Sequence, residues 1–251
     1  MLSVMGLVLT LALLGTPANQ QGVPPAQESI RFEKEIVKKI KVEGNFLLYL
    51  PKEYAKKGRE HFPLIIFLHG SGERGSDLEL VKKHGPPKLV EAGKDFPFII
   101  CSPQCPEGQG WSLDMLNGML DYLLKKYRVN ADRVYLTGLS MGGYGSWAWV
   151  AQNPERFAAV APICGGGDPK TVGSFKKIPL WAFHGMKDGA VPVERSIQMI
   201  DALKAVGASP KLTLYPEAGH DSWTESYNNP ELYEWFLKQV RPKPIEGTER
   251  P

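Results

Sequence analysis

The sequence predicts an α/β fold in which a mostly parallel, twisted sheet carries helices on both faces. Several short apolar runs have the pattern of strands that are buried on both sides. Segments with helical spacing separate these runs, and residues capable of chemistry follow them directly. Because strands that alternate with helices pair in parallel, the ends of the runs are expected to meet at one edge of the sheet.

The predicted strands are apolar runs rich in β-branched and aromatic residues. The first, 63–70, reads Pro-Leu-Ile-Ile-Phe-Leu-His-Gly. Five further runs follow it, at 97–101, 133–137, 158–161, 178–183 and 211–215. Ahead of them, residues 31–41 and 45–50 alternate apolar and polar side chains around Glu43 and Gly44, which predicts two antiparallel edge strands.

The predicted helices lie between these runs. Residues 113–127 place leucines along one helical face, and residues 193–206 show the same periodicity before Gly207. A helix is expected from Tyr144 onward, after Ser140. A last helix is expected to open at Asn229, with Pro230 in its first position.

The ends of the chain suggest processing. Residues 1–14 are largely apolar and small residues follow them, but the run is shorter than the ~20 residues of a membrane-spanning helix. We therefore expect residues 1–18 to be a signal peptide of a secreted or periplasmic protein, although its start lacks Lys and Arg. A retained membrane anchor or an internal first turn are the alternatives. Residues 19–30 then form a lead-in, 31–240 a single domain and 241–251 a flexible tail.

Composition argues against several classes of partner. The chain has 30 Lys and Arg against 27 Asp and Glu, a net charge of +3, and the basic residues are interspersed with acidic ones. This pattern argues against nucleic-acid binding. No stable membrane association is expected after signal cleavage, and no cofactor. Zinc is not expected either, because Cys101 and Cys105 have no neighbouring histidine.

The three cysteines are Cys101, Cys105 and Cys164. An odd number leaves at least one free thiol, and Cys101 lies within an apolar run. Cys105 and Cys164 both follow predicted strands, so a disulfide between them is a hypothesis that export would permit.

A Gly-x-Ser-x-Gly pentapeptide ends the run at 133–137, with Ser140 at its centre. Between a strand and a helix, such a turn holds the serine in a strained conformation with its hydroxyl exposed. The flanking glycines, Gly138 and Gly142, remove the Cβ atoms that would clash there. The pentapeptide alone is a weak signal. Its interpretation depends on a base, an acid and oxyanion donors after the other strands.

A serine nucleophile needs a base to take its proton and an acid to orient that base. His220 follows the last predicted strand and is the best candidate base. His61 precedes a strand and His84 lies in a helix or loop. His69 and His184 sit beside glycines at strand ends, where we expect packed, hydrogen-bonded roles.

Three aspartates compete for the role of the acid. Asp188 follows the run at 178–183, and loop position favours it. Asp168 lies in the loop one strand earlier, which some hydrolases use. Asp221 is adjacent to His220, and adjacent residues seldom bring a ring and a carboxylate together.

Two backbone amides are the candidate donors to an oxyanion. The amide of Met141, the residue after the serine, is one. The second is expected from the glycine-rich loop after the first buried run, with Ser71 as the leading candidate and Gly72 as the alternative. Glu73 and Arg74 in this loop are expected to pair with each other or to brace it.

These motifs together resemble a known family. The matching segments are 68–75, 102–106 with Trp111, 138–143, 184–192 and 219–223. From about Phe46 to Leu237, the chain resembles α/β-hydrolase esterases of the carboxylesterase and phospholipase group, close to the feruloyl and acetylxylan esterases of carbohydrate esterase family 1. The resemblance implies the α/β-hydrolase fold and a serine esterase with Ser140, Asp188 and His220 as its triad.

The substrate is less defined. Residues 163–177 leave no room for a large helical lid, so an open pocket for short acyl chains or polymer side groups is expected. Trp111, Trp223 and Tyr227 either form an aromatic wall that binds a phenolic acyl group or a sugar ring, or pack under the loops. The expected substrate is a small-molecule or polysaccharide-linked ester.

Other functions are compatible with a similar fold. A serine peptidase resembling the prolyl oligopeptidase catalytic domain is the main alternative, although those enzymes carry a large extra domain. Dienelactone hydrolases resemble the same fold but use a cysteine nucleophile, whereas residue 140 is serine. An inactive binding protein is a distant alternative, because no triad member is missing.

Overall fold

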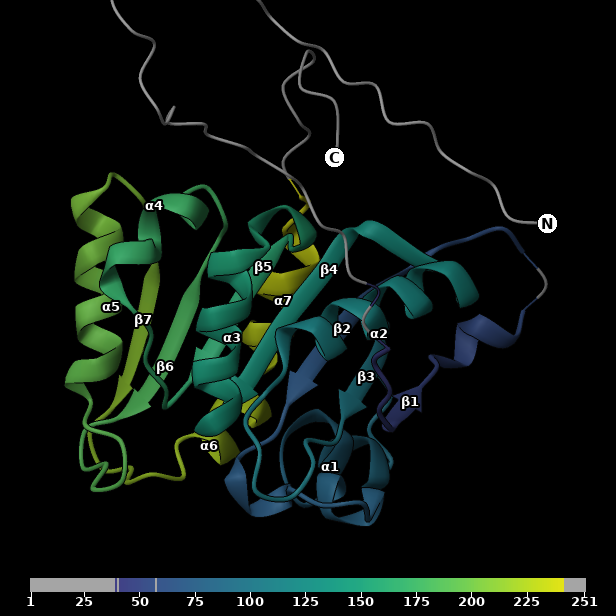
Figure 1. Ribbon diagram of the computed structural model, residues 1–251, viewed down its shortest axis with the longest axis horizontal. Coiled ribbons are helices and arrows are strands. Elements are labelled where there is room, and N and C mark those ends of the chain that lie inside the picture. Colours follow the sequence, from purple (N-terminus) through teal and green to yellow (C-terminus); the bar gives the residue numbers. More distant parts are fainter. Residues whose placement is uncertain (1–38, 40, 57, 242–251) are drawn as a thin grey trace, which may run out of the picture. The chain divides into compact units, whose positions relative to one another are not determined.

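The predicted runs assemble into one seven-stranded sheet in the computed structural model of the chain (Figure 1). The structure describes residues 39, 41–56 and 58–241. The chain divides after Ile40, and all of the described helices and strands lie in the unit that begins at Lys41. The predicted signal peptide at 1–18, the lead-in at 19–30 and nearly all of the tail at 241–251 lie outside the described residues.

The sheet has the strand order β1-β3-β2-β4-β5-β6-β7. Its members are β1 Phe46–Tyr49, β2 Phe62–Leu68, β3 Ile99–Pro103, β4 Val129–Leu139, β5 Ala159–Ile163, β6 Trp181–Gly185 and β7 Lys211–Tyr215. β1 runs antiparallel to β3, with Phe46 opposite Pro103, and the other pairs are parallel. The predicted mostly parallel sheet is confirmed. The strand predicted at 31–41 lies almost wholly outside the described residues.

Seven α-helices connect or flank the described strands. They are α1 Gly85–Glu91, α2 Leu113–Lys126, α3 Met141–Gln152, α4 Val172–Phe175, α5 Glu194–Ala205, α6 Trp223–Asn228 and α7 Pro230–Lys238. The predicted starts of α2 and α7 coincide with capping side chains: Ser112 accepts the amide of Met115 at α2, and Asn229 accepts that of Glu231 at α7. Short 3₁₀ turns occupy several loops, including η2 Ser71–Glu73 and η5 Pro169–Thr171.

Strand β2 shows how the sheet builds two cores. Leu64, Ile66 and Leu68 face the layer that includes α2, α3 and α5. Ile65 and Phe67 point to the opposite face, which α6 and α7 cover. Figure 1 shows α3 in front of the sheet and α7 behind it. Because both faces are covered, the strand reads as a continuous apolar run, and each buried Leu, Ile or Phe stabilises the fold by roughly 2 kcal/mol.

The hypothesis of a disulfide between Cys105 and Cys164 is wrong, because both are free, buried thiols. Cys105 follows β3 and Cys164 follows β5, with β2 and β4 between these strands. Three strand spacings separate the two residues by about 14 Å, twice the ~7 Å limit for the Cα atoms of a disulfide. The spacing of cysteines along the chain does not reveal this strand order.

None of the helices within the described residues combines the length and the hydrophobicity that crossing a bilayer requires.

Candidate active site

Ser140 occupies a sharp turn between β4 and α3, with φ 52° and ψ −114°. This conformation is strained for a residue with a side chain. It is possible because Gly138 and Gly142 flank it: a Cβ on Gly142 would overlap the carbonyl oxygen of Leu68, and one on Gly138 would overlap the backbone of Gly142. The Ser140 amide donates to the carbonyl of Ile163 at 3.0 Å, which fixes the turn to β5. The hydroxyl is left at the carboxyl edge of the sheet.

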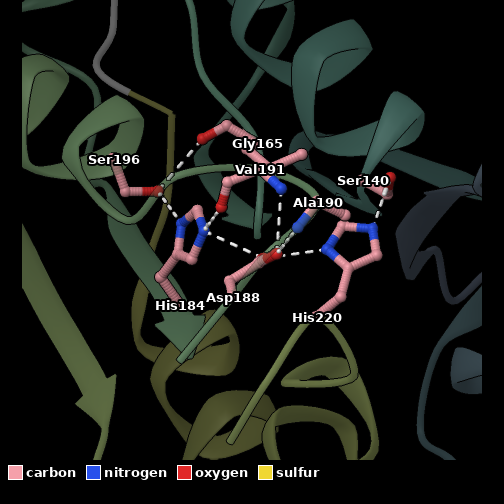
Figure 2. A network of polar contacts seen from close by, with 8 residues as sticks. All are labelled: Ser140, Gly165, His184, Asp188, Ala190, Val191, Ser196 and His220. Atoms are coloured by element: carbon pink, nitrogen blue, oxygen red, sulfur yellow. Dashed lines mark hydrogen bonds and ion pairs between the residues drawn. The ribbon is translucent and has the colours of Figure 1, made fainter. Parts of the chain in front are cut away.

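His220 and Asp188 reach Ser140 from the loops after β7 and β6 (Figure 2). The Nε2 atom of His220 lies 3.0 Å from the Ser140 Oγ. Its Nδ1 atom lies 2.8 Å from Asp188 Oδ2. A carboxylate only accepts hydrogen bonds, so Nδ1 carries the proton of the neutral ring and Nε2 is free to accept the serine proton. The three residues therefore form one hydrogen-bonded series.

The carboxylate of Asp188 is fully buried, with a side-chain exposure of 0%. Burial raises its pKa, but hydrogen bonds from His220 and from the amides of Val191 and Ala190 outweigh this effect, so the pKa lies below its usual value. Both amides lie 2.9 Å from Oδ1. Asp188 is therefore ionised at neutral pH and held in one orientation.

The two other aspartates do not contact His220 through their carboxylates. Asp168 is exposed and accepts the amide of Lys170 at the start of η5. Asp221 accepts both the amide and the hydroxyl of Thr224 at the start of α6. Their carboxylates cap local turns, which is a common role for aspartate.

The Met141 amide directly follows the nucleophile in the chain, and the loop that carries Ser71 approaches Ser140. Met141 is the first residue of the 12-residue helix α3, where amides lack a partner within the helix and the dipole is positive. Ser71 follows Gly70, and a Cβ placed on Gly70 would lie 3.7 Å from the Cβ of Ser140. The start of this loop, which carries both Ser71 and Gly72, therefore lies beside Ser140.

His69 packs against the loop that carries Ser71. Its buried ring lies with Nδ1 2.6 Å from the carbonyl of Gly70, and Nε2 accepts the amide of Cys105 at 3.0 Å. One nitrogen donates and the other accepts, so the ring is neutral. Burial lowers the pKa of His69 below its ordinary value, which agrees with that state. The residue connects the glycine-rich loop after β2, residues 70–74 and called the oxyanion loop below, to the loop after β3. This is the packed role expected for His69.

The three candidate wall aromatics have different surroundings. Trp111 packs on His69 at a centroid distance of 4.8 Å, and its indole donates to the His69 carbonyl at 3.4 Å. Tyr227 is buried in the core, with its hydroxyl 3.0 Å from that of Thr137. The contacts of both match the packing alternative. Trp223 is partly exposed and stands edge-on to His220, with ring centroids 5.2 Å apart, so it alone of the three contacts a triad residue.

His84 connects Trp223 to Glu73. The indole of Trp223 donates to Nδ1 of His84 at 3.3 Å. On its other side, His84 Nε2 lies 3.7 Å from the buried carboxylate of Glu73. Glu73 therefore pairs with His84, while Gln104 donates to its backbone carbonyl at 3.0 Å. These contacts brace the oxyanion loop, one of the two roles expected for Glu73.

One group of potential metal ligands occurs among the described residues. A sulfur of Cys164, a carboxylate oxygen of Asp188 and a ring nitrogen of His220 lie within 4.8 Å of one another. Burial raises the pKa of the Cys164 thiol to about 12, so the sulfur is protonated and a poor ligand. The other two atoms are hydrogen-bonded to each other. The arrangement suits proton transfer from Ser140 better than metal binding.

The contact between His184 and Asp188 was not predicted from the sequence. Its ring reaches the Asp188 carboxylate from the side opposite His220, at 3.2 Å (Figure 2). A packed role was expected from its position at a strand end. The four-residue spacing to Asp188 was the available signal, but such a contact depends on how the intervening loop turns.

Comparison with known proteins gives matches over much of the chain. Residues 106–233 match the dienelactone hydrolase family. A solved structure described as a thermostable esterase is 34% identical with a TM-score of 0.68, over 78% of this chain and 59% of that one. The α/β-hydrolase fold implied by the resemblance is confirmed.

Two curated proteins match shorter stretches. A putative carboxymethylenebutenolidase of Salmonella typhimurium is 30% identical over 100 residues, 36% of this chain and 37% of the relative. A bifunctional acetylxylan esterase/xylanase of Neocallimastix patriciarum is 26% identical over 151 residues, 56% of this chain and 21% of the relative. The chain thus spans less than two thirds of each of these proteins.

Proposed function

Because the chain belongs to the dienelactone hydrolase family, we propose that it hydrolyses carboxylic esters through an acyl-enzyme on Ser140. The observation that carries this proposal is the hydrogen-bonded series from Ser140 through His220 to Asp188, with contacts of 3.0 and 2.8 Å. The cysteine nucleophile expected of dienelactone hydrolases is replaced by Ser140. The site is therefore assigned to serine chemistry.

In the acylation step, Ser140 Oγ attacks the ester carbonyl while His220 Nε2 takes the hydroxyl proton. The carbonyl oxygen becomes an oxyanion, which the amides of Met141 and Ser71 stabilise; one such donor contributes about 3 kcal/mol. Asp188 stabilises the imidazolium without accepting its proton. His220 then protonates the leaving alcohol, and the acyl group stays on Ser140.

In the deacylation step, a water molecule replaces the alcohol. His220 removes a proton from that water as it attacks the acyl carbonyl, and the same two amides face the second oxyanion. Collapse of the intermediate releases the acid and returns the proton to Ser140. The resting hydrogen-bonded series is then restored.

The proposed substrates carry short acyl or aryl acyl groups, such as acetyl or feruloyl groups on a polysaccharide. Ser140 and His220 are partly exposed, and the β5 to β6 connection holds only η5 and the four-residue α4. The partly exposed ring of Trp223 beside His220 offers an aromatic surface to the acyl group or a sugar. One relative is an acetylxylan esterase/xylanase, which agrees with such a substrate.

A panel of acetyl, butyryl, long-chain and feruloyl esters, with a matched p-nitroanilide, tests the proposal. We expect the highest kcat/KM for the short-chain or feruloyl esters, and weak or no cleavage of the anilide. Ser140→Ala should lower kcat/KM by roughly four to six orders of magnitude. Ser174→Ala, which removes an exposed hydroxyl on α4, is the control and should retain activity.

Two results would overturn the proposal. Near-normal ester hydrolysis by Ser140→Ala would exclude Ser140 as the nucleophile. Faster cleavage of the anilide than of its matched ester would instead favour the serine peptidase alternative.

A further inference from the structure

His184 lies at the end of β6, buried against the triad carboxylate (Figure 2). Its Nε2 atom is 2.9 Å from the carbonyl oxygen of Val191 and 3.2 Å from Asp188 Oδ2. Its Nδ1 atom is 2.7 Å from the hydroxyl of Ser196 on α5. The side chains of His184 and Asp188 both have an exposure of 0%, so protein atoms must satisfy their hydrogen bonds.

The surroundings of Nε2 define its protonation. Both of its neighbours are acceptors: a backbone carbonyl has no proton to give, and the Asp188 carboxylate is ionised. An unprotonated Nε2 would place a lone pair against two oxygen atoms inside the protein. Nε2 therefore carries a hydrogen, shared between Val191 and Asp188.

The hydrogen bonds of Ser196 determine whether Nδ1 of His184 carries a hydrogen. The Ser196 hydroxyl donates its single hydrogen to the carbonyl of Gly165 at 3.0 Å. Its oxygen must then accept from Nδ1 of His184. If the hydroxyl instead pointed at Nδ1, two buried oxygens would face each other at 3.0 Å with no hydrogen between them.

His69 provides the internal contrast. It also lies at the end of a buried strand, but its Nε2 accepts an amide hydrogen from Cys105, so one proton is enough. Both nitrogens of His184 face groups that require a donor. We infer that His184 is a doubly protonated, cationic positioning residue that holds and partly neutralises the Asp188 carboxylate.

Among the residues that the structure describes, few charged groups lie around His184 and Asp188. His220 bonds the same carboxylate oxygen from the other side, and the Cys164 thiol nearby is neutral because burial raises its pKa. Arg195 on α5 lies beside Gly166, where an added Cβ would come within 2.9 Å of the Arg195 Cβ. Asp188 is thus the carboxylate that His184 contacts among the described residues.

The cation on His184 affects the proposed reaction, on which the inference rests. Asp188 attracts a proton to His220, and a cation on its other side weakens that attraction. Removing that cation should therefore strengthen the attraction of the Asp188 carboxylate for a proton on His220. The Nε2–H of His184 also holds Oδ2 in the orientation that His220 needs.

Nitrogen-15 NMR of the full chain labelled at histidine tests the protonation directly. At neutral pH, both ring nitrogens of His184 should show the shifts of protonated nitrogens, while His69 shows one protonated and one bare nitrogen. A bare ring nitrogen on His184 would overturn the inference. His184→Gln assigns the signals, and if that variant does not fold, neutron diffraction of the wild-type protein locates the same hydrogens.

Kinetics test the effect on the base. Gln keeps an N–H near the position of Nε2 but has no charge, so in His184→Gln the acidic limb of the kcat/KM profile should move up by about one pH unit. Ser196→Ala removes the acceptor of Nδ1–H and should move it in the same direction. Ser226→Ala, which removes another buried helical hydroxyl, is the control and should leave it in place. A merely structural role would lower kcat without moving the limb, and that result would overturn the tuning of His220.

The two proposals fail separately. If the wild-type protein cleaves no ester, the proposed function fails, but the NMR experiment still determines the protonation of His184. If ester cleavage depends on Ser140 and His184 has a bare nitrogen, only the present inference fails.

Discussion

Asp188 shows how the surroundings of one side chain select its chemistry. Its carboxylate accepts two amides on Oδ1 and faces two histidine rings on Oδ2. The hydrogen bonds from His220 and from the amides of Val191 and Ala190 favour the ionised form, which is why the pKa of Asp188 is low despite burial. The carboxylate can therefore orient His220 and stabilise its cation without taking the proton.

The substitution Asp188→Asn should separate the charge of this side chain from its shape. The new side chain would be an amide of similar size, and His220 would lose the acceptor that selects its tautomer, so kcat should fall by roughly four orders of magnitude. Asp168→Asn is the matched control, because that carboxylate caps an exposed turn. Steady-state kinetics on a short-chain ester measure both. Comparable losses in the two variants would contradict the assignment of the acid.

The β4–α3 turn is the element that places the nucleophile. A glycine inside a helix is ordinarily less stable than alanine by about 1 kcal/mol. Gly142 is an exception, because a Cβ there would overlap the carbonyl oxygen of Leu68 in β2. The helix thus approaches the sheet closely only because this residue lacks a side chain.

Gly142→Ala should therefore reverse the usual effect of the substitution. We expect it to lower the free energy of unfolding by about 3 kcal/mol or more and to reduce activity, because α3 must shift. Gly173→Ala in α4 is the control: a Cβ there meets nothing within 4 Å, so stability should be unchanged or rise by up to about 1 kcal/mol. Urea unfolding curves measure both. Equal stability of the two variants would show that the contact with Leu68 is relieved without cost.

At the same scale, the sequence predicted long elements better than short ones. The leucine periodicity of α2 and the cap of α7 are local signals, and both helices begin where these signals stand. The short helices α1, α4 and α6 were not predicted, because a few residues do not define a period. Tyr227 illustrates the result: it sits in α6 and turns into the core, a direction that depends on the neighbouring strands.

At the scale of the whole molecule, the parallel sheet brings the residues of the candidate site together at one edge. Parallel pairing carries the ends of β2, β4, β6 and β7 to the same side, which is why Ser71, Ser140, Asp188 and His220 could be proposed together from strand ends alone. Strand ends reveal neither the distance between strands across the sheet nor the direction of a side chain. The disulfide hypothesis was wrong because the distance across the sheet between Cys105 and Cys164 is too large. The contact between His184 and Asp188 was not predicted because it depends on side-chain direction.

The free energy of unfolding should depend on pH in part through His69. Its folded pKa lies below the unfolded value of about 6.5, so the unfolded chain takes up the proton first as the pH falls. Its contribution to stability is present above that value and is lost on acidification, with a slope of at most about 1.4 kcal/mol per pH unit. Between pH 7 and 5, the free energy of unfolding should therefore fall less in His69→Gln than in the wild type. Asp188 stays ionised in this range, because its pKa lies below its usual value.

The exposed His61, which precedes β2, provides the control. His61→Gln should keep the wild-type slope, as followed by urea unfolding at a series of pH values. The same slope in His69→Gln as in the wild type would show that the neutral, buried state of His69 is not a source of acid sensitivity.

The central claim, that Ser140 becomes acylated, is tested most directly by trapping the intermediate. The full-length protein is mixed with p-nitrophenyl acetate, quenched in acid and digested, and the peptides are analysed by mass spectrometry. We predict one acetyl group on the peptide containing Ser140, lost in Ser140→Ala and formed far more slowly in His220→Ala. Acetylation confined to another residue, with ester turnover unchanged in Ser140→Ala, would contradict the account.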